Sequence, residues 1–410
     1  MSGCSASQIR FTERSRAAGG APASYWLLLA FLFLLYANLP LVMPALDVIR
    51  PAQLLAGAAL LTLLAERAFA RKSLELAWPE GCLLLTFLAA GALSSLTALW
   101  PRLAAESVLD LLKMSFVFFF IVNCANTERR LRGVIWTLVV GGLLPAVGTL
   151  NNYLQGNLVD GRAAWIGTFG NPNELAYSLV ILLPLAACLA ADLDLMPRLA
   201  VLGIVLTFVA AILVSFSRGG LLALVAVLGL YAWRKWSIAL QGLMLLIVVA
   251  GLILAAQFWS RGEGFQHLSQ DLSFQQRIAT MQVGMAMFAD HPLFGVGLGC
   301  SAIAWPLYAP EGLYTRGALV THNTFLQALG ETGIVGFTLF ILFIGFGLYH
   351  ARKAALGSAG KGLAGLNAGI EIAIWGFVVC GLSGGYVLTW FPYILLGLAA
   401  SARRITGEIQ

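Results

Sequence analysis

The sequence predicts an all-α, polytopic membrane protein. Of its 410 residues, 60% are hydrophobic and only 11% are charged, far from the usual balance of a soluble domain. The apolar residues gather in runs long enough to cross a bilayer, since roughly 20 helical residues span about 30 Å of hydrocarbon. Lys and Arg recur between alternate runs, which is typical of loops retained in the cytoplasm.

About twelve transmembrane helices are expected, one for each apolar run. The runs lie near 24–43, 48–65, 81–100, 103–123, 133–153, 173–191, 199–216, 219–233, 238–258, 333–350, 363–382 and 386–402. The first run is too long for a cleaved signal peptide, so we expect it to remain as an anchor. With the N-terminus inside, seventeen of the twenty-five Lys and Arg residues fall on the cytoplasmic side. The net charge of +6 is therefore a topology signal, and no nucleic-acid partner is expected.

These runs divide the chain into five parts. A cytoplasmic segment (1–23) precedes transmembrane helices 1–9 (24–258), and a large outer loop forms a helical domain (259–332). Transmembrane helices 10–12 (333–402) and a cytoplasmic tail (403–410) follow. The outer loop interrupts the hydrophobic pattern for over seventy residues, so function is expected there.

The stretch "SFQQRIATMQVGMAMFADHP" in this loop predicts an amphipathic helix. Its apolar seam comprises Phe274, Ile278, Met281, Met285 and Phe288. A second helix is expected to start at Thr321, whose hydroxyl would cap it, and to run towards the tenth span. His322 would then lie in the first turn, at the outer membrane boundary.

Histidine is the natural candidate for a general base. Its unperturbed pKa of about 6.5 lets it accept a proton from a hydroxyl at neutral pH. His322 is the outer histidine that precedes a helix rather than a proline or a polar stretch. The alternative is an interfacial residue that only forms hydrogen bonds.

Arginines supply candidate anion contacts. Every basic residue expected on the outer side is an arginine: Arg50, Arg102, Arg162, Arg218, Arg261, Arg277 and Arg316. A planar guanidinium can hold phosphate oxygens through paired hydrogen bonds. Arg218, in "SFSRGG", and Arg277, beside the apolar seam, are the leading candidates, with Arg50, Arg162 and Arg316 behind them. The alternatives are snorkelling to lipid headgroups for Arg218 and a solvated helix face for Arg277.

Neither a metal nor another cofactor is expected. The outer acidic residues are scattered and show no ligand spacing. Glu106, Asp110 and Lys113 can pair on one helical face of the fourth span. The combination of arginines and a histidine suits glycan transfer from a lipid pyrophosphate, because arginines can bind the anionic leaving group and a histidine can act as the base without a metal. The glycan of such a donor is already activated.

Four segments resemble the O-antigen ligase and O-antigen polymerase superfamily of bacterial envelope glycosyltransferases. They are "GTFGNPNELA" (Gly167 to Ala176), "SFSRGG" (Ser215 to Gly220), "FADHPLFGVGLG" (Phe288 to Gly299) with the helix of Arg277 before it, and "HNTFLQALGETGIVG" (His322 to Gly336). Their order around a long outer loop also matches. The resemblance covers roughly residues 165 to 350.

This resemblance implies a metal-independent, inverting glycosyltransferase of the membrane-embedded GT-C type. Such ligases move glycan from undecaprenyl pyrophosphate to a sugar of lipid A core, at the periplasmic face of the bacterial inner membrane. His322 resembles the family's essential histidine, and Arg218 and Arg277 resemble the arginines that engage the donor pyrophosphate. Asn323 and Glu331 match the motif without an assigned role. Some relatives carry an acidic residue near the last outer turns, whereas that turn reads "LSGGYVLTW" here.

Two alternatives to an O-antigen ligase stay open. A polymerase would use the same donor but extend another lipid-linked glycan. The compact length and the single long loop before the last three spans favour the ligase. A twelve-helix transporter is the more remote alternative, because transporters concentrate polar residues near the midplane and not at one rim.

Overall fold

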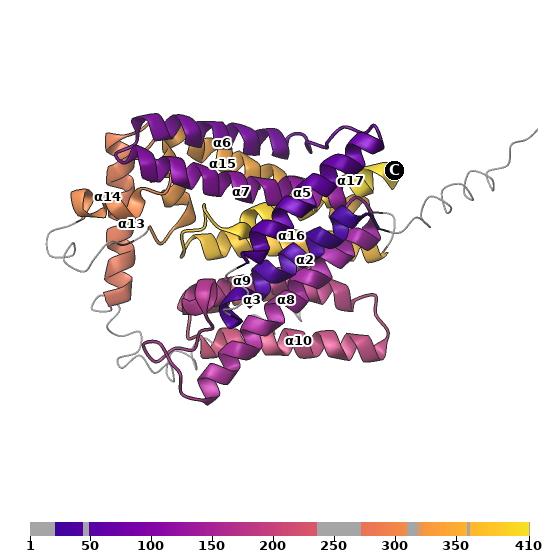
Figure 1. The fold of residues 1–410 in the computed structure, drawn as a ribbon. Coiled ribbons are helices and arrows are strands. Elements are labelled where there is room, and N and C mark those ends of the chain that lie inside the picture. Colours follow the sequence, from indigo (N-terminus) through magenta and orange to yellow (C-terminus); the bar gives the residue numbers. More distant parts are fainter. Residues whose placement is uncertain are drawn as a thin grey trace, which may run out of the picture.

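The structure, a computed structural model, is a bundle of helices (Figure 1). It describes residues 21–43, 49–235, 272–309, 319, 321–358 and 361–409. Within these ranges every regular element is a helix, and the one strand-like pairing is an isolated bridge between Val159 and Arg162. The predicted all-α fold is therefore confirmed.

The helices follow one another with short connections over most of the chain. Their bounds are α2 (Ala23–Ala37), α3 (Leu39–Val42), α5 (Pro51–Phe69), α6 (Glu80–Thr97), α7 (Pro101–Cys124), α8 (Glu128–Leu154), the 3-10 helix η1 (Gly167–Gly170), α9 (Pro172–Ala190), α10 (Leu195–Val214), α11 (Arg218–Lys235), α13 (Leu272–Asp290), α14 (Ser301–Tyr308), α15 (Thr324–Gly357), α16 (Lys361–Gly381) and α17 (Trp390–Ile409).

Eight of the described helices are long and apolar enough to cross a membrane, which supports a multi-pass membrane protein. They are α5, α6, α7, α8, α9, α10, α15 and α16. The predicted count of twelve is not reached among the described residues. Helix α2 has only 15 residues, α11 and α17 are not among the eight, and the predicted run 238–258 lies outside the described residues.

The first predicted span, 24–43, is broken near its end. Helix α2 stops at Ala37 because Asn38 adopts a left-handed conformation with φ of 47°. The short helix α3 then restarts with Pro40 in its first turn, where the missing N–H of proline costs no helical hydrogen bond. A single apolar run in the sequence thus becomes two helical pieces.

Helix α9 lies at the centre of the bundle. It packs against α8, α10, α11 and α16, and most of its side chains are buried. By contrast, α5 and α10 lie at the outside, where Leu61 and Leu206 are 69% and 68% exposed. An exposed leucine-rich face of this kind suits a hydrocarbon solvent.

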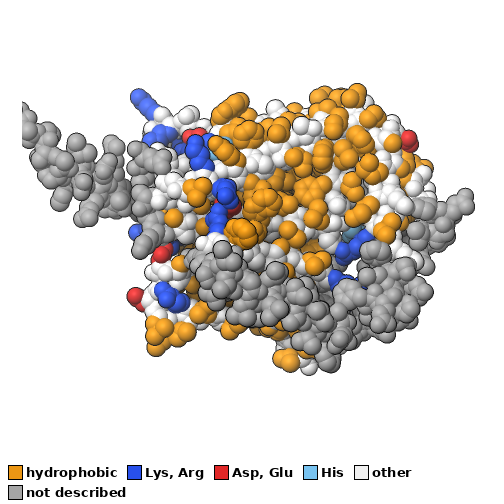
Figure 2. All heavy atoms as spheres, turned by 180° about the vertical axis from the view of Figure 1, so that it is seen from behind, with side chains coloured by type: hydrophobic (Ala, Val, Ile, Leu, Met, Phe, Trp, Pro, Cys, Tyr) orange, Lys and Arg blue, Asp and Glu red, His pale blue; other side chains and the backbone are white. Residues whose placement is uncertain are grey.

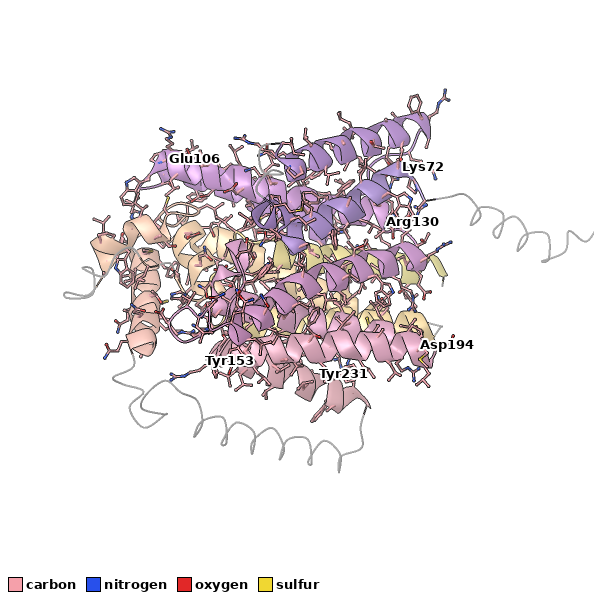
Figure 3. The ribbon with its side chains drawn as sticks, turned by 60° about the horizontal axis from the view of Figure 1, so that its bottom comes forward. Lys72, Glu106, Arg130, Tyr153, Asp194 and Tyr231 are labelled. Atoms are coloured by element: carbon pink, nitrogen blue, oxygen red, sulfur yellow. The ribbon has the colours of Figure 1, made fainter. Side chains whose placement is uncertain are left out.

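The bundle has two chemically different ends. Figure 3 shows Lys72, Arg130 and Asp194 towards one end and Glu106 and Tyr153 towards the other. We call the first the basic end; helix α17 also finishes there, and α13 crosses the opposite end, here called the α13 end (Figure 1). Figure 2 shows a mainly hydrophobic surface between the ends, with most charged side chains gathered at the basic end.

Helix α13 does not bury its predicted apolar seam. Ile278, Met281 and Met285 are 42%, 36% and 49% exposed. The buried face instead carries Ala279, Val283 and, one turn after Val283, Met287. Small residues let α13 approach α15 closely, because a Cβ on Gly330 would lie 3.2 Å from the carbonyl oxygen of Gly284. Close backbone approach therefore decides which face is inside.

Buried carboxylates pair with basic residues at the basic end. Glu80 of α6 has no exposed surface and accepts a hydrogen bond from Arg403 of α17 at 3.1 Å. The Nδ1 atom of His350 on α15 also lies against Glu80. Glu371 of α16 pairs with Arg234 of α11. These contacts join helices that are distant in sequence, so the basic residues here do more than set topology.

We predict that Glu80→Ala destabilises the fold strongly. The change leaves Arg403 without its buried partner, and breaking a buried ion pair costs about 3–5 kcal/mol. Glu106→Ala is the matched control, because Glu106 pairs with Arg102 at the surface, where side chains are 59% and 94% exposed. Thermal unfolding in detergent should show a large fall in Tm for Glu80→Ala and almost none for Glu106→Ala. Equal small shifts would contradict a structural role for the Glu80 pair.

Candidate active site

His322 lies at the α13 end, just before helix α15. The helix begins at Thr324, and its cap is Asn323, whose Oδ1 accepts hydrogen bonds from the backbone N–H groups of Phe325 and Leu326 at 2.9 and 3.0 Å. The expectation that Thr321 caps the helix is wrong, and so is the placement of His322 in its first turn. Asparagine is the stronger N-cap, so the cap lies two residues later than expected and leaves His322 outside the helix.

The residues after His322 bind the turn that follows α16. This turn, Leu382–Tyr386, is called the 382–386 turn below. The Nδ2 atom of Asn323 donates to the carbonyl oxygen of Leu382 at 3.3 Å. The hydroxyl of Thr324 donates to the carbonyl oxygen of Gly384 at 2.7 Å and accepts from the N–H of Tyr386 at 3.0 Å. His322 is therefore held against this turn by its neighbours in the chain.

Two further helices meet the same turn at Ser383. Arg277 of α13 donates a hydrogen bond to the Oγ of Ser383. The hydroxyl of Tyr177, from α9, donates to the same oxygen at 2.8 Å. A Cβ on Gly219 would lie 2.0 Å from the Tyr177 hydroxyl and 2.6 Å from the Ser383 oxygen, so the start of α11 touches both. Arg218, the first residue of α11, precedes this glycine.

The structure thus brings together the three segments that carry the leading candidates. Arg277 binds Ser383 and lies close enough to His322 to act on its charge. Arg218 is the residue before Gly219, which lies against Tyr177 and Ser383. Neither Ser383 nor Tyr177 was a candidate in the sequence. Tyr177 lies one residue beyond the quoted "GTFGNPNELA" segment, and Ser383 lies in the turn that lacks the relatives' acidic residue. The sequence signal that could have identified Ser383 is its position as a polar residue in this turn, where some relatives carry an acidic residue.

The surroundings of His322 keep its ring neutral at physiological pH. Burial lowers the pKa of His322 below its ordinary value, because a charged imidazolium loses hydration, and the positive charge of Arg277 lowers this pKa further. A neutral imidazole can accept a proton from a hydroxyl. The electrostatics of the site therefore suit a general base.

Arg162 holds the segment that leads into α11. Its Nε donates to the carbonyl oxygen of Ser215 at 2.9 Å, and its Nη2 donates to Oδ1 of Asn173 at 2.6 Å. The same Oδ1 accepts from the hydroxyl of Ser217 at 2.8 Å, and Ser217 in turn accepts from the N–H of Gly220 at 3.1 Å. This network fixes the N-terminus of α11, and with it the position of Arg218.

The remaining arginine candidates are not joined to this site. Arg50 is exposed at the start of α5, with a left-handed φ of 45°. Among the described residues, nothing connects it with His322 or Arg277. Arg316 lies outside the described residues. Donor contacts by Arg50, Arg162 and Arg316 stay predictions.

Glu331 has a scaffold role. Its buried carboxylate accepts from the N–H of Gly299 at 2.9 Å and of Ser301 at 3.4 Å. Two residues later, α15 breaks at Gly333, whose φ is 63°. A Cβ there would lie 2.3 Å from the carbonyl carbon of Leu293, so only glycine fits. The "GVGLG" turn is thereby fastened to α15, and the break falls where the tenth span was predicted to begin.

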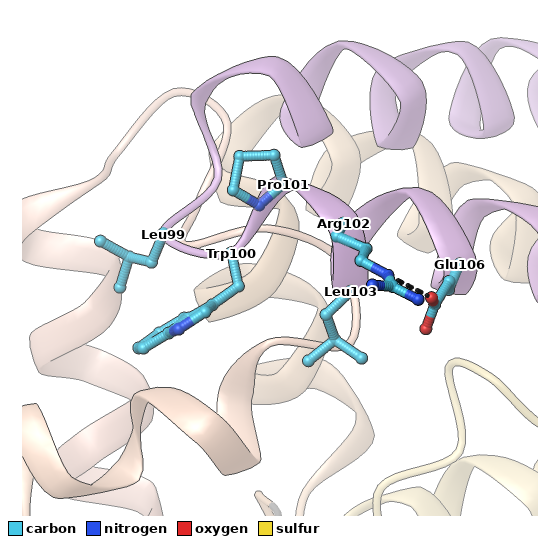
Figure 4. Close-up of a pocket in the computed structure, with 6 residues that line it drawn as sticks. All are labelled: Leu99, Trp100, Pro101, Arg102, Leu103 and Glu106. Carbon is cyan, nitrogen blue, oxygen red and sulfur yellow. Dashed lines mark hydrogen bonds and ion pairs between the residues drawn. The ribbon is translucent and has the colours of Figure 1, made fainter.

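The charged group in α7 pairs as two separate couples. Lys113 contacts Asp110 at 2.7 Å, as predicted, whereas Glu106 binds Arg102 at 3.2 Å and not Lys113. Arg102 and Glu106 line an open cavity of about 420 Å³ together with Trp100 (Figure 4). The cavity contains neither His322 nor Arg277, so it is separate from the candidate site.

No group of three or more His, Cys, Asp or Glu side chains that could hold a metal ion occurs among the described residues. The expectation of metal independence stays a prediction.

Comparison with known families agrees with the resemblance in the sequence. Residues 202–341 match the family model described as O-Antigen ligase, and this stretch contains Arg218, Arg277 and His322. The match supports the resemblance to the O-antigen ligase and polymerase superfamily over this stretch of the chain. The family includes both ligases and polymerases, so the match does not separate them.

A search of curated proteins found no match. Among solved structures, the chain is similar to one from "Structural coordination of polymerization and crosslinking by a peptidoglycan synthase complex", with 16% identity and a TM-score of 0.46 over 80% of this chain and 96% of that chain. At this TM-score the likeness carries no argument.

We predict that Arg277→Gln raises the pKa of His322. Removing the neighbouring positive charge makes the imidazolium less unfavourable, so the titration midpoint should move upwards from a value below about 6.5. NMR titration of isotope-labelled histidines measures this midpoint, and only four histidines need to be assigned. Arg102→Gln, which changes an exposed arginine paired with Glu106, is the matched control and should leave the midpoint unchanged. An unchanged midpoint in Arg277→Gln would show that the two side chains do not interact.

Proposed function

Since residues 202–341 match the O-antigen ligase family model, we propose that this protein is an O-antigen ligase of lipopolysaccharide assembly. It transfers O-antigen polysaccharide from undecaprenyl pyrophosphate to a sugar hydroxyl of lipid A core. The enzyme lies in the bacterial inner membrane, with its α13 end facing the periplasm and its basic end in the cytoplasm. The excess of Lys and Arg at the basic end supports this orientation.

The observation that carries this proposal is the meeting of Arg277 and His322. The partner of Arg277 is the neutral hydroxyl of Ser383, and within the described part of the chain no carboxylate pairs with this guanidinium. By contrast, Arg234 and Arg403 at the basic end bind buried carboxylates. An uncancelled arginine beside a neutral histidine suits an anionic leaving group and an incoming hydroxyl.

The reaction follows from these roles. His322 takes the proton of the acceptor hydroxyl while the hydroxyl oxygen bonds to the anomeric carbon of the donor. The bond between that carbon and the diphosphate oxygen breaks, and undecaprenyl pyrophosphate leaves with the electron pair. Arg218 and Arg277 stabilise the charge that develops on the leaving group. Attack opposite the leaving group inverts the anomeric centre, as in a GT-C-type enzyme, and the step uses no cofactor.

A polymerase is the second candidate, because it shares donor, motifs and chemistry. Purified protein supplied with lipid-linked glycan and lipid A core distinguishes the two. Glycan attached to lipid A supports the ligase, whereas lengthened lipid-linked glycan supports the polymerase. Transfer of glycan to either acceptor also excludes a transporter. An unchanged transfer rate in the presence of a chelator supports a metal-independent step.

We predict that His322→Ala abolishes glycan transfer. Loss of a general base typically slows a reaction by about 10²–10⁴-fold, and the buried site leaves no other described base beside Arg277. Transfer to lipid A core by purified protein is the measurement, with thermal unfolding as the check that the variant folds. His291→Ala, which changes a histidine at the end of α13, is the control. Normal transfer by folded His322→Ala would remove the general-base assignment.

We also predict that Lys at position 218 or 277 does not replace Arg. Arg218→Lys and Arg277→Lys keep the charge but lose the planar fork that binds two phosphate oxygens. Initial rates should fall by roughly tenfold or more, the cost of one charge-assisted hydrogen bond. Arg102→Lys is the control for a general effect of this substitution. Undiminished rates in both site variants would refute the pyrophosphate assignment.

A further inference from the structure

Ser383 lies where the segments of the candidate site meet. The helices α9 and α13 reach its hydroxyl oxygen through Tyr177 and Arg277, and Gly219 at the start of α11 touches the same atom. The segment after His322 binds the backbone on both sides of Ser383. No sequence motif assigned a role to this serine.

The Ser383 hydroxyl carries a proton that can be donated to a ligand. A serine hydroxyl has one proton to donate and two lone pairs to accept with. Arg277 donates to its oxygen. The Tyr177 hydroxyl lies 2.8 Å from the same oxygen and 3.4 Å from the carbonyl oxygen of Ser383, so its own proton can go to either acceptor. Apart from this Tyr177 hydroxyl, no acceptor for the Ser383 proton occurs among the described residues. A hydroxyl that accepts a charge-assisted bond is polarised, which makes it a stronger donor to a further acceptor.

We propose that Ser383 is a further substrate-binding residue of this site. Its oxygen holds the Arg277 guanidinium beside His322, and its proton donates to an oxygen of the donor's diphosphate. This inference rests on the proposed function, which supplies the diphosphate. The alternative is a purely structural serine that only ties the 382–386 turn to α9.

Inorganic pyrophosphate is the probe that separates these roles. Full-length protein in detergent is titrated with pyrophosphate by calorimetry, as wild type, Ser383→Ala, Ser383→Thr and Ser115→Ala. Ser115 is the matched control, because it is a buried serine whose hydroxyl donates, as far as the described residues go, only to the carbonyl oxygen of Leu111 in its own helix. Ser383→Ala should raise the Kd by roughly tenfold, Ser383→Thr should restore binding, and Ser115→Ala should not change it.

A double-mutant cycle tests whether Ser383 acts through Arg277. Without Ser383 the guanidinium is released from its place, so the pKa of His322 should rise in Ser383→Ala as it does in Arg277→Gln. Arg277 is the charge that acts on His322 among the described residues. Arg277 also acts on Tyr177 and Tyr386, and Cys380 and Glu174 are further titratable groups that act on Tyr386. Adding Ser383→Ala to Arg277→Gln should then give no further shift. A full additional shift would show that Ser383 does not hold Arg277.

The outcomes separate this inference from the proposed function. Pyrophosphate binding that depends on Ser383, in a protein that transfers no glycan, would refute the ligase while supporting the anion site. Active transfer together with unchanged pyrophosphate affinity in folded Ser383→Ala would overturn the inference alone. If Ser383→Ala does not fold, Ser383→Cys keeps a side chain of similar size but replaces the hydroxyl with a weak donor and acceptor. Normal pyrophosphate binding with an unshifted His322 titration in that variant overturns the inference.

Discussion

The candidate site depends on one buried hydroxyl, that of Thr324, which both donates to and accepts from the 382–386 turn. Thr324 has no exposed surface, and its two hydrogen bonds join the start of α15 to the connection between α16 and α17. This contact brings His322 within reach of Arg277, because Ser383 lies in the same turn. The hydrogen bond from Asn323 to the carbonyl oxygen of Leu382 adds a second anchor next to His322.

Arginine side chains have different kinds of partner at the two ends of the bundle. At the basic end, carboxylates such as Glu80 and Glu371 neutralise the guanidinium groups and tie helices together. At the α13 end, the described partner of Arg277 is a hydroxyl oxygen, which orients the guanidinium without cancelling its charge. Arginine thus suits both structural stability and anion recognition. A carboxylate partner neutralises its charge, whereas a neutral oxygen partner leaves the charge available for an anion.

Several features could be predicted because they depend on local pattern. Apolar runs of membrane length predicted the all-α fold, and a polar break predicted that the tenth span begins near Gly333. The motif order named His322, Arg218 and Arg277 as candidates for one site, and their roles stay predictions. The amphipathic helix predicted around Arg277 is present as α13. One prediction failed because a stronger cap is available: Asn323 caps α15 in place of Thr321.

Hydrophobic length and charge along the chain were enough to predict a multi-pass helical protein, because bilayer thickness and the cost of buried charge act on each segment independently. The leading site residues were named with the help of the motifs that resemble the O-antigen ligase superfamily, and their roles stay predictions. The partners of those residues were decided only by the tertiary structure. Ser383 and Tyr177 are 206 positions apart, and Arg277 comes from a third helix. Local sequence cannot indicate such a meeting, since it depends on how α9, α13 and the 382–386 turn pack against one another.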